Sequence, residues 1–209
     1  GTLDIIIGKG PSARTIQLEL PPFTLLAATT RVAAVSSPLR SRFSGGVYRL
    51  EFYTEEELEE IIRRSAKILG VETSRGAEKA IAKRARFTPR TANYFLKRAR
   101  DYAQVHKTPL DDDAVTEALK LLGVDDVGLT PSDRKLLQTM AEKFSGGPVG
   151  LGTLAAALSE EEATIEEFNE PYLIQLGLIE RTPRGRMLTV NGYKHIGLTP
   201  PKNLQNKLL

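Results

Sequence analysis

The chain has 209 residues, of which 26% are charged and 41% hydrophobic, a composition typical of a globular protein with one large or two to three small domains. It has no cysteine and only His106 and His195 as histidines, which excludes disulfides and thiolate or histidine zinc clusters, so we predict no metal ligands. No apolar run approaches the roughly 18 residues of a membrane span and no signal peptide is visible, so we expect a cytoplasmic protein without a membrane partner. The net charge of +3 permits nucleic-acid binding without requiring it.

The first segments predict part of an open α/β sheet. Ile5–Ile7 and Thr15–Leu20 flank a Gly/Pro cluster and predict a β-hairpin, because the second arm alternates apolar and polar residues. Phe23–Ala28 is a short apolar run, which is typical of a strand buried on both faces of a parallel sheet. Thr30 would then lie at the carboxyl edge of that strand, where open α/β sheets bind their ligands.

Two further short elements are expected before residue 54. Ser37–Phe43 predicts a single helical turn that presents two arginines, and Val47–Phe52 predicts a second strand. Buried strands without neighbours expose unpaired edges. Whether residues 1–50 are ordered alone, pair with another copy or are completed by another chain stays open at this point.

Apolar residues recur at helical spacing in four successive segments between residues 54 and 123. Thr54, Ser74 and Asp111 are residues that cap helix starts, and Pro89 suits a first helical position, where its missing N–H costs nothing. We therefore expect a compact bundle of four helices over residues 54–124.

The remainder predicts a winged helix, a relative of the helix-turn-helix. A polar linker at residues 125–129 precedes three helical patterns and two short strands that are separated by a Pro-Arg-Gly turn. The expected elements are Ser132–Phe144, Leu151–Leu158, Thr164–Leu176, Leu178–Thr182 and Arg186–Val190. Pro200–Leu209 is expected to be a frayed tail.

The strands of this winged helix form a basic wing. Arg181, Arg184 and Arg186 are the predicted DNA contacts, since phosphate binding by arginine makes affinity salt-dependent without reading sequence. Residues 159–170, in contrast, contain six glutamates and no Lys or Arg, which argues against that helix entering a groove. Within them, Ser159 and Glu162 have the spacing of a capping box.

Six ordered blocks of this sequence resemble the RuvB family of AAA+ ATPases, the motor subunits of bacterial Holliday junction branch migration. The blocks are Gly10–Arg31, Ser37–Phe43, Arg49–Thr54, Thr88–Asn93, Gly146–Leu158 and Glu170–Arg186. The resemblance implies a multidomain fold, α/β plus mainly α: residues 1–53 as the carboxyl-terminal part of the large ATPase core, 54–124 as a helical-bundle lid and 125–209 as a winged-helix DNA-binding head.

Two features of the family are missing from the sequence. A phosphate-binding loop G-x-x-x-x-G-K-[ST] is absent, since Gly8-Lys9-Gly10 fails the spacing, and no apolar strand ends in an Asp-Glu pair for Mg²⁺. The family carries both upstream of where this chain begins, so we expect the carboxyl-terminal part of a subunit. Such a chain should not hydrolyse ATP by itself, and its status as an enzyme stays open.

The resemblance also implies roles for individual residues. Thr30 matches the sensor residue near the γ-phosphate, and Arg42 matches the arginine finger that reaches a neighbouring subunit, with Arg40 as the alternative. Arg90 matches the lid arginine that contacts the phosphates, and Tyr53 matches the tyrosine beside the base. The implied cofactor is ATP or ADP with Mg²⁺ in the complete subunit, and none is expected to bind tightly to this chain alone. The plain structural alternatives are a turn threonine, surface arginines and a core tyrosine.

The implied partners are double-stranded DNA at Holliday junctions, RuvA through the hairpin Ile5–Ile16, other copies in a hexameric ring and, indirectly, RuvC. A second hypothesis is a non-catalytic winged-helix DNA-binding regulator with an accessory helical domain, which would need no nucleotide. Thr30, Arg42 and Arg90 favour the motor, because a regulator has no use for three phosphate-facing groups at these places.

Overall fold

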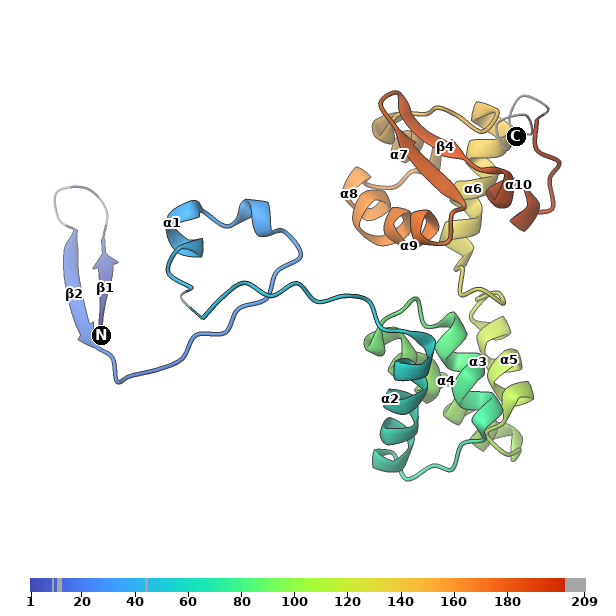
Figure 1. Ribbon diagram of the computed structural model, residues 1–209, viewed down its shortest axis with the longest axis horizontal. Helices are drawn as coiled ribbons and strands as arrows, with labels where there is room; N and C mark the ends of the chain where they lie inside the picture. The colour runs from blue at the N-terminus through green and yellow to red at the C-terminus, as the bar shows by residue number, and fades with distance from the viewer. Residues whose placement is uncertain (9, 11–12, 44, 202–209) are drawn as a thin grey trace. The chain divides into compact units, whose positions relative to one another are not determined.

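The computed structural model describes residues 1–8, 10, 13–43 and 45–201, and the chain divides into two compact units, residues 1–50 and 51–209 (Figure 1). The multidomain fold class expected from the sequence is confirmed. Most of the predicted tail, from Lys202 onward, lies outside the described residues. No helix in the described ranges is long and apolar enough to cross a bilayer.

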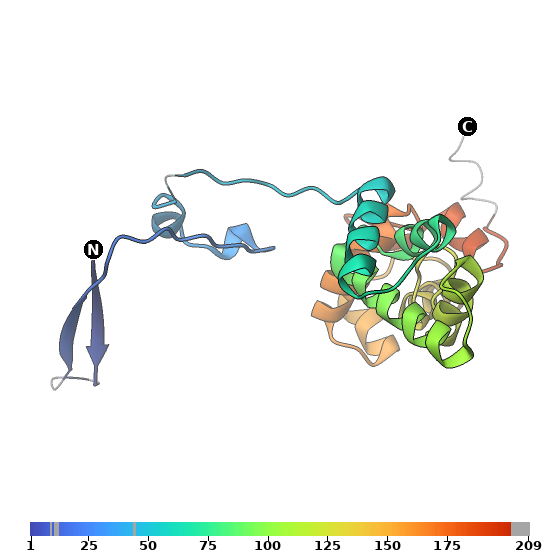
Figure 2. The same cartoon turned by 90° about the horizontal axis from the view of Figure 1, so that it is seen from below.

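The first unit contains the predicted hairpin. Strands β1 (Thr2–Ile7) and β2 (Arg14–Glu19) form an antiparallel hairpin (Figure 2). Within it, Ile5 lies opposite Ile16. A short 3-10 turn, η2 (Val32–Ala34), and the single helical turn α1 (Ser37–Arg40) follow it. None of the described residues of this unit is buried.

Two predicted strands of this unit are wrong. Neither Phe23–Ala28 nor Val47–Phe52 forms a strand, and Leu26 is 90% exposed. An apolar run becomes a buried strand only when neighbouring strands satisfy its backbone groups and other layers cover its side chains. The described part of residues 1–50 supplies neither around these runs, because its strands are the β1–β2 pair alone.

The lid is a bundle of four helices, as predicted (Figure 1). Helix α2 packs against α3 and α4, and α5 packs against α3 and α4. Their bounds are Glu55–Ile68 for α2, Arg75–Arg84 for α3, Pro89–His106 for α4 and Asp112–Leu121 for α5. The fully buried side chains that hold the bundle together are Leu58, Ile62, Ile81, Leu96 and Leu119.

The helix starts follow the capping residues found in the sequence. Thr54 and Glu57 form a capping box, in which the Thr54 Oγ1 accepts the Glu57 N–H at 3.2 Å and the Glu57 carboxylate accepts the Thr54 N–H at 2.9 Å. Ser74 and Asp111 each accept a backbone N–H three residues later at 3.0 Å. These contacts satisfy helix donors that have no partner within the helix.

The predicted winged helix is present, with two additions. A short helix, α10, follows the wing, and the third helical segment is interrupted by a π-helical turn, η3. The elements are α6 (Pro131–Phe144), α7 (Leu151–Leu158), α8 (Glu162–Thr164), η3 (Ile165–Asn169), α9 (Glu170–Gln175), β3 (Ile179–Thr182), β4 (Gly185–Leu188) and α10 (Val190–His195). Their core includes Leu129, Leu136, Leu137, Met140, Leu154, Ile165, Leu173 and Leu188.

The capping box predicted at Ser159 and Glu162 is wrong. Ser159 adopts a left-handed conformation, with φ of 58°, and its N–H bonds back to the end of α7, so it terminates that helix. Glu161 stands at the N-cap of α8 without a side-chain capping bond. A residue that closes one helix in the left-handed region lacks the extended backbone that an N-cap requires.

Arg86 joins the lid to the winged helix. Its guanidinium donates to the Asp133 carboxylate at 3.2 Å and to the Phe168 carbonyl at 3.0 Å, and it stacks over the Tyr172 ring with 4.6 Å to the centroid. The Tyr172 hydroxyl donates to the Val127 carbonyl at 2.5 Å, and burial raises the pKa of Tyr172 to about 12. The phenol therefore stays a proton donor at neutral pH, and the two domains share a polar and aromatic contact.

Candidate nucleic-acid interface and nucleotide-facing residues

The wing presents its three predicted DNA-binding arginines on one short hairpin. Strands β3 and β4 pair antiparallel with Arg181 directly opposite Arg186, and Arg184 lies in the turn between them. The turn is closed by the Thr182 hydroxyl, which donates to the Gly185 carbonyl at 2.8 Å. The Arg184 side chain is exposed and forms no ion pair within the described part of the chain. It is therefore available to an external anion.

The other two arginines converge on one carboxylate. Arg181 Nε lies 2.6 Å from Glu170 Oε1, and Arg186 Nη2 lies 3.0 Å from Glu170 Oε2. Glu170, in the first turn of α9, has a side chain that is only 1% exposed. The backbone of Arg186 also exchanges two hydrogen bonds with Val149, at 2.8 and 2.9 Å, so β4 is held from both sides. Arg186 thus has a structural role in fixing the wing.

These contacts keep Glu170 ionised. Burial alone would raise the pKa of its carboxyl, but hydrogen bonds and charge from Arg181 and Arg186 outweigh burial and hold that pKa below its usual range. The hydrogen bonds that Arg181 donates to Glu170 in turn raise the pKa of Arg181. Both partners are charged at neutral pH, so the carboxylate offsets part of the positive charge that the sequence assigns to the wing.

Two of the predicted nucleotide-facing residues, Tyr53 and Arg90, lie in the second unit, at the lid helices. Arg90 lies in the first turn of α4, is exposed, and has no partner for its guanidinium within the described residues. Tyr53 immediately precedes α2, and its N–H points to the carbonyl of Phe87 at 3.4 Å, in the segment that leads into α4. The structure therefore brings Tyr53 and the start of α4 to the same end of the bundle.

The other two nucleotide-facing residues lie in the first unit. Thr30 and Arg42 are both exposed, and the Arg42 guanidinium donates to the carbonyl of Pro38 at 2.8 Å, in the same helical turn. This local bond is the structural alternative to an arginine finger. No described residue around Thr30 or Arg42 is buried, so the unit supplies polar groups without an enclosing site.

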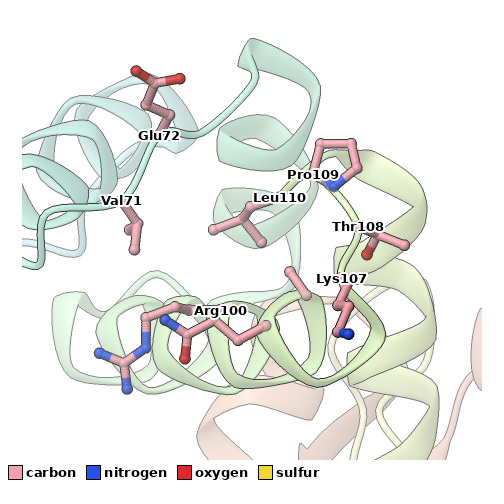
Figure 3. A pocket seen from close by; sticks show the side chains of 9 residues that line it. Val71, Glu72, Arg100, Lys107, Thr108, Pro109 and Leu110 are labelled. Atoms are coloured by element: carbon pink, nitrogen blue, oxygen red, sulfur yellow. The ribbon is translucent and has the colours of Figure 1, made fainter.

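A hollow of about 330 Å³ lies in the lid, and none of the predicted site residues lines it (Figure 3). It is lined by the loop after α2 and the end of α4, with Val71, Leu110 and Lys107 among its residues. Arg100 at its rim is paired with Asp101 at 2.7 Å. The hollow offers no convergent set of polar groups, so we assign no role to it.

Residues that sequence reasoning missed are Glu170, Glu166 and Arg86. Glu166 and Glu170 are four positions apart and directly precede the basic wing, which is a spacing that could have indicated shared partners. Arg86 carries no such pattern. Its partners lie 47 and 82 positions away, and only tertiary structure brings them together.

Three family models match consecutive parts of the chain. They are described as the Holliday junction DNA helicase RuvB P-loop domain over residues 1–50, the RuvB AAA lid domain over 53–125 and the RuvB C-terminal winged helix domain over 126–197. Among curated proteins, the Holliday junction branch migration complex subunit RuvB of Treponema denticola is 54% identical over 96% of this chain. The subunit of the same name from Lawsonia intracellularis is 54% identical over 94% of the chain.

The chain is also similar to solved RuvB structures. The Thermotoga maritima RuvB Holliday junction branch migration motor is 48% identical over 80% of this chain and 56% of its own, with a TM-score of 0.75. A mutant of that protein matches over 88% of this chain and 61% of its own, with a TM-score of 0.81. The chain spans 58% of the length of the two curated relatives.

Proposed function

This chain belongs to the RuvB family, and on that premise we propose that it acts as part of an ATP-dependent motor subunit that translocates duplex DNA and drives Holliday junction branch migration. The identity to the Treponema relative extends over 96% of the chain and supports this proposal. A winged-helix regulator would not require the lid and P-loop-domain matches over residues 1–125. The motor is therefore favoured over the regulator.

The wing is the proposed DNA-binding surface, and the exposed Arg184 at its tip is the observation that carries this proposal. Arg181 is half exposed and is a second phosphate contact, whereas Arg186 acts mainly by fixing the strand. Arginine binds phosphate through charge and paired N–H donors and carries no sequence preference in such contacts. The proposed binding is therefore electrostatic and independent of sequence.

The lid and the first unit are proposed to contribute to nucleotide handling between copies in a hexameric ring. The exposed, unpaired Arg90 with the half-exposed Tyr53 fits the lid side of an ATP or ADP site. Thr30 and the arginine finger Arg42 would serve the γ-phosphate, and bound ATP with Mg²⁺ would supply the phosphoryl group that is hydrolysed. The residues present offer no phosphate-binding loop, so we expect no tight nucleotide binding by this chain alone.

The hairpin Ile5–Ile16 is the proposed docking site for RuvA. Its strands present exposed apolar side chains, including Ile5, Ile6, Ile7 and Ile16, which a partner would cover. RuvC would be reached only indirectly, through the junction. The proposed functional domains are residues 1–53, 54–124 and 125–209.

Duplex binding tests the wing proposal. Fluorescence anisotropy with labelled duplex DNA across a salt series should show binding that weakens with salt, and Arg184→Ala should weaken it further and lower the salt slope by about 0.9 for each lost phosphate contact. Lys67→Ala is the matched control, because it removes the same charge from an exposed position at the end of α2. Equal effects of the two variants would exclude a specific role of the wing tip.

The arginine finger needs a longer chain. When this sequence is joined to the amino-terminal part of the Treponema relative, Arg42→Ala should lower ATP hydrolysis about 10³-fold or more with nucleotide binding retained. Arg40→Ala is the comparison, because Arg40 lies on the same turn. Loss of hydrolysis in Arg40→Ala alone would move the assignment to Arg40.

A further inference from the structure

Two arginines and two glutamates form a closed charge cluster beneath the wing. Arg181 Nη2 contacts Glu166 Oε1 at 2.8 Å and Glu170 Oε2 at 3.1 Å, while Arg186 contacts Glu170 through Nε and Nη2. All four side chains are polar neighbours of one another, and their formal charges cancel. Two of the three arginines expected to attract DNA are therefore neutralised by carboxylates of the same chain.

The cluster has a buried half and an exposed half. Glu170 is 1% exposed and Arg186 is 15% exposed, so their pair is shielded from solvent. Glu166 and Arg181 are 48% and 53% exposed, so theirs is not. Exposed ion pairs contribute little stability and exchange readily, whereas a shielded pair is costly to break. Only the Glu166 contact is suited to exchange with an external anion.

We propose that Glu166 is an internal competitor of DNA, which occupies Arg181 in the free protein and is displaced by a backbone phosphate when the wing binds duplex. Glu170 stays in place and holds the guanidinium of Arg181 toward the surface. This inference rests on the proposed function of the wing in DNA binding. It assigns to Glu166 the control of how tightly the wing binds DNA. Displacement replaces the Arg181–Glu166 ion pair with an Arg181–phosphate ion pair, so the net gain in binding free energy is small.

Such a contact suits a protein that moves along DNA. Each phosphate contact must be released before the next is formed. Release is favoured because the Glu166 carboxylate can pair with Arg181 again when the phosphate leaves. The competitor also lowers the number of counterions set free on binding, because Arg181 is already neutralised. Glu166 is therefore an affinity-determining residue that needs no contact with DNA itself.

Glu166→Gln in the full chain tests this, with Glu160→Gln as the matched control. Both substitutions remove one negative charge from the acidic segment, but Glu160 is exposed and has no ion pair with the wing in the described residues. By duplex anisotropy at low salt, Glu166→Gln should bind several-fold more tightly than the wild type, with a salt slope steeper by about 0.9. Glu160→Gln should change affinity less than twofold and leave the slope unchanged.

The dependence on Arg181 is tested in a second background. In Arg181→Ala, which removes the guanidinium that Glu166 contacts, Glu166→Gln should gain no more affinity than Glu160→Gln does. Equal gains from the two Gln variants in the wild-type background, or a full gain in Arg181→Ala, would overturn the inference. If Arg184→Ala still weakened binding in that case, the wing proposal would stand. If neither the wild type nor any variant bound duplex, both proposals would fail.

Discussion

Residues 1–50 and residues 51–201 are both rich in apolar side chains, yet only the second region buries them. Leu26 is 90% exposed in the first region, whereas Leu96 in the lid and Leu173 in the winged helix are fully buried. The second region also satisfies its helix ends locally, as at Thr54, and holds one of its buried charges, Glu170, between two arginines. The difference lies in available neighbours and not in composition.

This contrast separates the proposed functions. Thr30 and Arg42, proposed to act on the γ-phosphate, lie in the region without buried residues, where no packed core supports their side chains. Arg90 and the wing arginines lie on elements anchored to a core. Precise positioning of side chains requires packed support, so DNA binding is the proposed function that depends least on parts outside this chain.

The largest effect is expected from removing a core side chain. Leu96→Ala should lower the free energy of unfolding by roughly 3–5 kcal/mol, because the leucine is fully buried and its loss leaves a cavity. Leu26→Ala, the same change in the first region, should stay within about 0.5 kcal/mol. Urea unfolding followed by circular dichroism measures both, and similar losses would remove the contrast between the regions.

The second-largest loss of stability is expected from removing the buried carboxylate of Glu170. Glu170→Ala leaves Arg186 without its shielded partner, and we expect a loss of roughly 3 kcal/mol, near the lower end for a broken buried pair because Arg181 is half exposed. Glu19→Ala, on the exposed strand β2, is the control and should have no measurable effect. A Glu170→Ala protein as stable as the wild type would contradict a structural role for this cluster.

A smaller effect should appear with pH. The folded-state pKa of Glu170 is depressed, so its contribution to stability is fully present above the unfolded-state pKa of about 4.3 and is lost as the pH falls through the folded-state value. Between about pH 5 and pH 3, the wild type should therefore lose more stability than Glu170→Gln. Parallel curves from urea unfolding at several pH values would show that Glu170 does not titrate as described.

The smallest effect is expected on the lid surface. Glu117 and Lys120 form an exposed i,i+3 pair at 3.6 Å, and Glu117→Gln should change the free energy of unfolding by less than about 0.5 kcal/mol. The same urea titration gives this value. A loss above 1 kcal/mol would mean that exposed charges, and not only the core and Glu170, hold the second region together.

The elements that the sequence predicted well depend on residues close together in the chain. The N-cap at Thr54 depends on residues within one helical turn, and the apolar face of α4 repeats within its own length. Phe23–Ala28 failed because an apolar run indicates a preference for burial without showing whether other strands are there to bury it. The π-helical turn that carries Phe168 has no local sequence signature of this kind.

The charge of the candidate site could be predicted from the sequence, but its ion pairs could not. The basic character of the wing follows from the residue types, and so does the acidic character of residues 159–170. That Glu170 lies between Arg181 and Arg186 follows from the packing of α9 against β3, over separations of 11 and 16 positions. This packing pairs Arg181 and Arg186 with Glu170 and leaves Arg184 exposed, which is a difference that residue types alone do not indicate.

The most direct test of DNA binding by the wing is a titration of the isotope-labelled protein, 23.0 kDa, with duplex DNA, followed by backbone amide NMR shifts. We predict that the largest shifts cluster at residues 182–185, around Arg184, with smaller ones on the exposed face of η3 where Glu166 is released. Shifts confined to residues 1–50, or to the lid helices, with the wing amides unmoved would contradict it.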